Sequence, residues 1–165
     1  MIDVITILNA AQSVGSTLAS VYSFLTKQSN TSNIHKKMVF RELRDNLKRL
    51  ENRNKKNVKL EKVIASLDNS AIKKGFEEGF DFNNLTGSKK NIVTIDIVFK
   101  KRNKRYLGWN AEKLIDSIDS KIVELKDLIS YYDKLEDSNN NFPLKLSNLY
   151  YQILLLVILV NESKK

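Results

Sequence analysis

The chain has 165 residues, of which 42% are apolar, and its 28 lysines and arginines outnumber 19 aspartates and glutamates for a formal net charge of +9. This length and composition predict a single folded domain, and the presence of only one proline and five glycines favours long helices over a β fold. The absence of cysteine excludes disulfides, thiol nucleophiles and cysteine-based zinc sites, so we expect a cytoplasmic protein.

The first 26 residues carry one formal charge, Asp3, and residues 1–27 are predicted to form an amphipathic helix. One face carries hydroxyls and amides instead of charges. The other face carries an apolar stripe for membrane insertion or helix packing, formed by Val4, Ile7, Ala11, Val14, Leu18, Val21 and Leu25. The segment lacks the features of a secretory signal, and its polar face would be costly in lipid for one isolated helix. Several copies could cross a bilayer together, because a helix of this length spans the hydrocarbon core.

A second helix is predicted from about residue 33 to 54, and a third from about residue 59 to 74. The second helix has a basic row beside its apolar stripe, formed by Lys37, Arg41, Arg44 and Lys48. These side chains are candidates for contacts with the phosphates of lipid or nucleic acid. Gly75 is predicted to end the third helix as a left-handed C-cap.

Residues 83–108 form a basic connector whose conformation the sequence leaves open. Val93, Ile95 and Ile97 alternate as in a strand, but no second strand is available to pair with them. A helix and an extended cover are therefore the alternatives. The connector supplies further candidates for phosphate contacts, namely Lys100, Lys101, Arg102, Lys104 and Arg105. Tyr106 and Trp109 follow them and would permit stacking on nucleic-acid bases if they are exposed.

Two more helices complete the chain. Asn110 is predicted to cap a fourth helix that runs to about residue 132, and Pro143 suits the first turn of a fifth. Every residue from Ile153 to Val160 is apolar, so the fifth helix must be central. The sequence therefore predicts an all-α antiparallel bundle of about five helices, forming one domain over residues 1–165.

Charge is distributed unevenly along this chain. Residues 27–62 and 89–105 are strongly basic, whereas residues 112–137 carry eight acidic residues against four basic ones. Such segments can partly neutralise one another, and the basic surplus favours an anionic partner. Catalytic motifs are absent, and the single histidine, His35, lies among basic residues at a predicted helix start. We therefore expect neither an enzyme nor a metal or cofactor site.

The order of these parts resembles the helical bundles of regulated cell death. These are the HeLo-type domains of fungal death effectors, the amino-terminal bundle of the necroptosis pseudokinase, and the bacterial Bell-type domains. The resemblance lies in "VITILNAAQSVGSTLASVYSFL", "FRELRDNLKRLE" and "KLIDSIDSKIVELKDLI", and it covers nearly all of residues 1–135. It implies a bundle that is held inactive, oligomerises, and then perturbs a membrane with its amino-terminal helix. The chain shows no separate sensor domain, so the resemblance implies a trigger supplied by a partner protein.

Three functions are compatible with these features. The leading one is a membrane-acting, oligomerising effector of a prokaryotic defence or toxin system, with its apolar stripe inserting and its basic residues contacting anionic lipid. The first alternative is a basic helical subunit of a nucleoprotein complex that binds a nucleic-acid backbone. The second alternative is an interaction module whose partner buries the apolar last helix. We expect a homo-oligomer or a partner protein, and a location in the cytoplasm, peripheral to the inner face of the membrane if lipid is the target.

Overall fold

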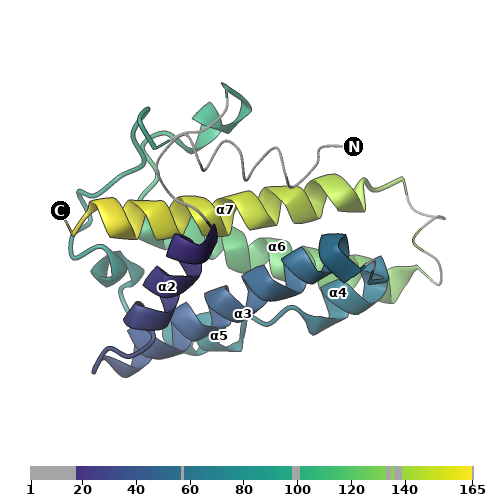
Figure 1. Cartoon of the computed structure of the whole chain (residues 1–165), viewed down its shortest axis with the longest axis horizontal. Coiled ribbons are helices and arrows are strands. Elements are labelled where there is room, and N and C mark those ends of the chain that lie inside the picture. The colour runs from purple at the N-terminus through teal and green to yellow at the C-terminus, as the bar shows by residue number, and fades with distance from the viewer. Residues whose placement is uncertain (1–17, 57, 98–100, 133–134, 136–138, 165) are drawn as a thin grey trace.

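The computed structural model describes residues 18–56, 58–97, 101–132, 135 and 139–164, and it confirms an all-α bundle (Figure 1). The α-helices are α2 (Leu18–Gln28), α3 (Ile34–Lys56), α4 (Leu60–Ser66), α5 (Ser70–Glu77), α6 (Ala111–Tyr131) and α7 (Phe142–Glu162). Two short 3-10 helices, η1 (Phe82–Leu85) and η2 (Lys101–Tyr106), lie between α5 and α6. Of the predicted opening helix, only the final part is described, as α2.

Helix α7 is the central helix, as its composition predicted. Every residue from Leu149 to Val160 is buried, and α6, α3 and α2 pack around the helix (Figure 1). The Asn141 side chain accepts a hydrogen bond from the amide of Leu144, and Pro143 lies in the first turn. Among the described helices, α7 has the length and the mean hydropathy, 1.6, of a membrane-spanning segment, but 78% of that apolar window is buried inside the bundle. Its apolar surface is therefore covered by the chain itself.

Helix α6 also follows the sequence prediction. Asn110 caps it, because its side-chain oxygen accepts a hydrogen bond from the amide of Lys113 at 3.0 Å. Its apolar face is buried against the core through Leu114, Ile115, Ile118, Ile122 and Leu125. The acidic residues of this segment consequently face outward.

The predicted third helix is two helices, α4 and α5, separated at residues 67–69. The break is stabilised by side chains of α3. The Asn46 amide nitrogen donates to the carbonyl of Asp68 at 2.6 Å, and its oxygen accepts from the amide of Asp68 at 2.9 Å. These two bonds replace helical hydrogen bonds, so the chain can leave α4 and start α5 in a new direction.

Gly75 has a different role from the predicted C-cap. It lies inside α5, where a β-carbon added to it would approach Cζ of Phe82 to 2.6 Å. The glycine therefore permits close packing of α5 on the buried Phe82 ring. The left-handed conformation occurs four residues later at Gly79, with φ of 69°.

The connector is an extended cover with two 3-10 turns. Val93 donates its amide to the carbonyl of Trp109 and accepts from the amide of Gly108, which pins the segment to the start of α6. Val93 and Ile97 are buried, whereas Ile95 is 56% exposed, because the chain turns between Thr94 and Ile97. The strand-like alternation of the sequence therefore does not describe the packing of this segment.

Candidate anion-binding surface

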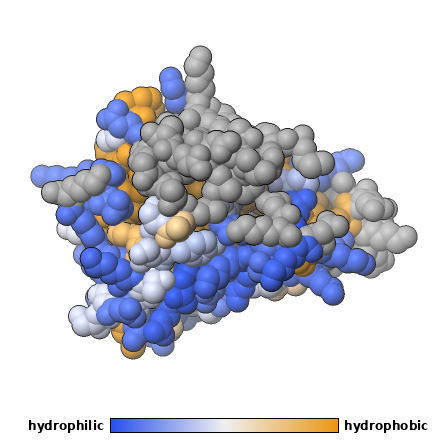
Figure 2. Space-filling view, in the orientation of Figure 1, coloured by the Kyte–Doolittle hydropathy of each residue, from blue (hydrophilic) through white to orange (hydrophobic). Residues whose placement is uncertain are grey.

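The basic row of α3 lies at the surface of the bundle. Arg41 and Lys48 are exposed, and Lys37 and Arg44 are half-buried. The Arg44 guanidinium pairs with Asp45 on the same helix at 3.1 Å. Figure 2 shows a hydrophilic band along this helix. Arg41 and Lys48 are therefore the members of the row that are best placed to meet an anionic surface.

Helix α2 packs directly beside this row. The ammonium group of Lys48 lies 5.9 Å from the centre of the Tyr22 ring, a cation–π contact between α3 and α2. Val21 and Leu25, two members of the predicted apolar stripe, are buried in the core. Leu18 is the first residue of α2, while Val4, Ile7, Ala11 and Val14 lie outside the described residues. The described end of the stripe thus packs within the bundle.

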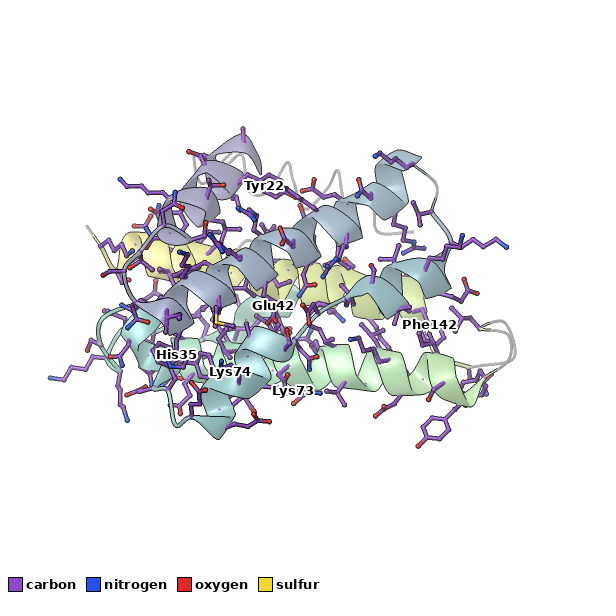
Figure 3. All side chains as sticks on the ribbon, turned by 90° about the horizontal axis from the view of Figure 1, so that it is seen from below. Tyr22, His35, Glu42, Lys73, Lys74 and Phe142 are labelled. Atoms are coloured by element: carbon purple, nitrogen blue, oxygen red, sulfur yellow. The ribbon has the colours of Figure 1, made fainter. Side chains whose placement is uncertain are left out.

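A buried carboxylate lies beneath the contact between α2 and α3. Glu51 is 7% exposed and accepts a hydrogen bond from the Tyr150 hydroxyl of α7 at 3.2 Å. Tyr22 points from α2 towards α3 (Figure 3), and burial together with the nearby Glu51 carboxylate raises the pKa of the Tyr22 hydroxyl far above its usual range. Glu51 of α3 thus accepts a hydrogen bond from Tyr150 of α7, and it lies close enough to Tyr22 of α2 for its charge to raise the pKa of that hydroxyl.

A second buried carboxylate of α3, Glu42, caps α5. Its oxygens accept from the amides of Ala71 at 2.6 Å and Ile72 at 3.3 Å, and Figure 3 shows Glu42 between α3 and α5. Burial raises the pKa of Glu42 to about 7, although the two backbone hydrogen bonds oppose that shift. Glu42 and Asn46 lie beside one edge of the apolar stripe of α3, so the local pattern does not distinguish them from other polar residues that flank it.

The basic residues of the connector are separate from the α3 row. Lys104 and Arg105 are exposed. Lys101 and Arg102 lie in η2, and Lys100 lies outside the described residues. Arg105 donates to the Tyr106 hydroxyl at 2.9 Å and lies 4.9 Å from the centre of its ring. The described side chains of the two groups make separate contacts, Arg105 with Tyr106 on the connector and Lys48 with Tyr22 on α2.

The structure buries one of the two aromatic side chains that stacking on nucleic-acid bases would use, and it half-buries the other. Tyr106 is 2% exposed and packs between Trp109 and Tyr151, with ring centres 5.0 Å and 6.0 Å away. Trp109 is half-buried, and the ammonium of Lys113 lies 4.8 Å from its ring centre. Both aromatic side chains are occupied by packing because they anchor the connector to α6 and α7.

The structure also shows an apolar surface that the sequence analysis did not identify. Ile92, Ile95 and Leu107 of the connector are 42%, 56% and 39% exposed. A hollow of about 510 Å³ lies beside Ile92, between the connector and the end of α7. The alternating pattern of the sequence groups Ile95 with Val93 and Ile97, which are buried. Ile95 is exposed because the chain turns between Thr94 and Ile97.

His35 is used structurally, since its Nε2 lies 3.3 Å from Glu78 and its ring stacks on Phe80. The described residues contain no cluster of three or more histidine or carboxylate side chains suited to a metal ion. Comparisons of the chain with protein-family models, curated proteins and solved structures find no match.

Proposed function

We propose that the protein is a non-enzymatic helical-bundle effector that oligomerises and acts at anionic membranes, as part of a prokaryotic defence or toxin system. The observation that carries the proposal is the contact between Lys48 and Tyr22, which puts the basic row of α3 beside α2. Helix α2 continues from the nearly uncharged opening segment. A bilayer that binds the basic row therefore also meets the helix that is chemically suited to enter it.

The charges of the row supply the attraction. Each lysine or arginine near an anionic membrane contributes about 1 kcal/mol, so the exposed Arg41 and Lys48 favour docking at the inner face of the membrane. Lipid phosphates would also compete for Lys48 and so weaken its contact with Tyr22. Loss of that contact would remove one of the attachments of α2, which also places Val21 and Leu25 in the core and packs Phe24 against it.

The second candidate is binding of a nucleic-acid backbone, which the exposure of the same two cations also favours. A backbone contact would depend steeply on salt and would not depend on lipid composition. Burial of Tyr106 leaves the half-buried Trp109 as the remaining aromatic side chain after the connector cations, so base stacking adds little support to this alternative. An interaction module whose partner covers α7 has less support, because the chain itself already covers α7.

Dye release from vesicles tests the proposal, with the full chain and phosphatidylcholine vesicles that contain or lack phosphatidylserine. The double variant Arg41→Glu, Lys48→Glu should lower release from anionic vesicles on the order of a hundredfold, because two attractions become repulsions. The matched control, Lys62→Glu, Lys73→Glu, makes the same charge change at exposed positions of α4 and α5, and Figure 3 labels Lys73. It should retain most of the activity.

Two results would contradict the proposal. Equal losses in the two double variants would mean that net charge, not the α3 row, drives the effect. No binding or release by the parent chain at any anionic lipid content would exclude membrane action and leave the nucleic-acid backbone as the candidate. Circular dichroism of each variant confirms that the bundle is intact.

A further inference from the structure

The connector presents an apolar patch flanked by cations. The hydrogen bonds of Val93 with Gly108 and Trp109 hold residues 92–95 against the segment that contains Leu107. Ile92, Ile95 and Leu107 are thereby exposed on neighbouring segments.

Lys90 precedes this patch, Lys104 precedes Leu107, and both are exposed. Figure 2 shows hydrophobic atoms beside hydrophilic ones over the connector. We call Lys90, Ile92, Ile95, Lys104 and Leu107 the connector patch; Asp96 is an exposed acid within the same segment.

Helix α6 carries more acidic than basic residues, namely Glu112, Asp116, Asp119, Glu124 and Asp127 against Lys113, Lys121 and Lys126. Asp116, Asp119, Glu124 and Asp127 lie on its solvent side, opposite the buried apolar face, and span about 16 Å at the helical rise. A shallow hollow of about 480 Å³ on this side is lined by Asp119, Ser120, Val123, Glu124, Asp127 and Leu128. Figure 3 shows α6 along the lower edge of the bundle.

Two of these carboxylates are already engaged within the chain. Asp119 accepts from the Asn69 side chain at 2.7 Å, and Glu124 pairs with Lys145 at 2.5 Å. Asp116 and Asp127 are exposed, and among the described residues no basic side chain forms an ion pair with either. The exposed Asp116 and Asp127 therefore remain available for a contact, near the aliphatic side chains of Val123 and Leu128 and with exposed Lys113 one turn before Asp116.

We propose that the connector patch of one copy docks on the outer face of α6 of a second copy. The exposed Lys90 and Lys104 of the connector patch are opposite in sign to Asp116 and Asp127 of α6, and each surface also offers aliphatic side chains. These charge pairs and apolar side chains are what the contact would join. The occupant is a second copy because the same chain provides both halves. This inference rests on the proposed function, for which it supplies the contact that makes the oligomer.

The contact would join two different surfaces and is therefore heterologous. In Figure 1 the connector lies above α7 and α6 lies behind it, so one copy offers a docking surface on each of two sides. Repetition of such a contact produces a ring if the rotation closes and a filament if it does not. The row on α3 takes no part in the contact and stays available for lipid.

Reciprocal charge reversal in the full-length chain tests the contact. One variant carries Lys90→Glu, Lys104→Glu, and the other carries Asp116→Lys, Asp127→Lys. Each alone places like charges in the contact and should weaken self-association on the order of a hundredfold, measured by sedimentation with and without phosphatidylserine vesicles. An equimolar mixture restores opposite charges at both kinds of contact, so it should associate about as tightly as the parent chain.

A matched pair of substitutions tests the apolar part of the contact. Ile95→Ser, Leu107→Ser should weaken association at least about tenfold, because two aliphatic side chains no longer leave water. The control Ile34→Ser, Leu144→Ser alters one isoleucine and one leucine that are 65% and 39% exposed elsewhere. It should associate like the parent.

The outcomes separate this inference from the proposed function. A parent chain that remains monomeric with and without vesicles, or a mixture that associates no better than its components, overturns the docking. If dye release by the parent nevertheless depends on Arg41 and Lys48, membrane action stands without this contact. Recovery in the mixture supports the docking even when vesicles do not leak.

Discussion

At the residue scale, buried polar side chains of α3 determine how the chain folds around that helix. Glu42 and Asn46 are 6% and 0% exposed and bind backbone groups at the break between α4 and α5. A buried polar group is tolerated when its hydrogen bonds are made, and these two make theirs to amides and a carbonyl that a continuous helix would have used internally. Two side chains thereby convert one predicted helix into two.

Glu42 makes the stability of the bundle depend on pH. Its pKa rises from 4.5 to about 7 on folding, so the folded state binds the proton more tightly than the unfolded chain. The contribution of Glu42 to the unfolding free energy is therefore greatest below pH 4.5 and is lost as the pH rises through about 7. The fall amounts to about 3 kcal/mol for a shift of this size.

The variant Glu42→Gln should lack this fall, because glutamine does not ionise. Urea unfolding of both proteins below pH 4.5 and above pH 7 measures the difference. If the two unfolding free energies change in parallel with pH, Glu42 does not carry the dependence.

At the element scale, α2 is the link between the bundle and the low-charge opening segment. Its inner side places Val21 and Leu25 in the core, and the edge-to-face contact of Phe24 with Phe40, at 6.4 Å, adds to its attachment. Its outer side carries exposed serines. A charge placed at Val21 or Leu25 would therefore test folding, whereas a charge on the outer side tests insertion.

Ser23→Asp applies that test, because Ser23 is exposed in the folded bundle. If α2 enters lipid, an aspartate there costs about 3 kcal/mol near the bilayer centre, so dye release should fall on the order of a hundredfold while the fold is unchanged. Ser32→Asp is the control, since it adds the same charge at an exposed position in the loop after α2. Equal release by both variants would show that α2 stays on the bundle.

At the scale of the whole molecule, the bundle combines a central apolar helix with charged surfaces of opposite sign. Helix α7 is buried from Leu149 to Val160, whereas α2 crosses the bundle near one end (Figure 1). Elements with few buried contacts open at lower free energy than the core. The arrangement therefore allows α2 to detach while α6 and α7 remain packed.

Hydrogen exchange measures this difference directly. The amides of α7 should exchange only by global unfolding, while those of α2 should exchange at least about thirtyfold faster by local opening, because fewer side chains hold α2 in the core. Exchange at one common rate in both helices would mean that α2 cannot leave without unfolding the bundle. Membrane action by release of α2 alone would then be excluded.

The sequence by itself determined the helical class, the central place of α7 and the capped start of α6. These follow from local signals, since apolar periodicity, an all-apolar run and the N-cap Asn110 act through residues near in the chain. It also predicted that the basic row of α3 is a surface feature, because a row at helical spacing beside an apolar stripe must point outward.

Tertiary structure decided the features that depend on partners distant in the sequence. Asn46 lies 22 residues before Asp68, and its hydrogen bonds to Asp68 separate α4 from α5. Gly75 lies inside α5, where the nearby Phe82 ring leaves no room for a β-carbon. Tyr106 is buried by Tyr151 of α7, and Ile95 is exposed by a turn that alternation does not report. Such contacts arise only when separate helices meet, so their energies are not encoded in any short window of the chain.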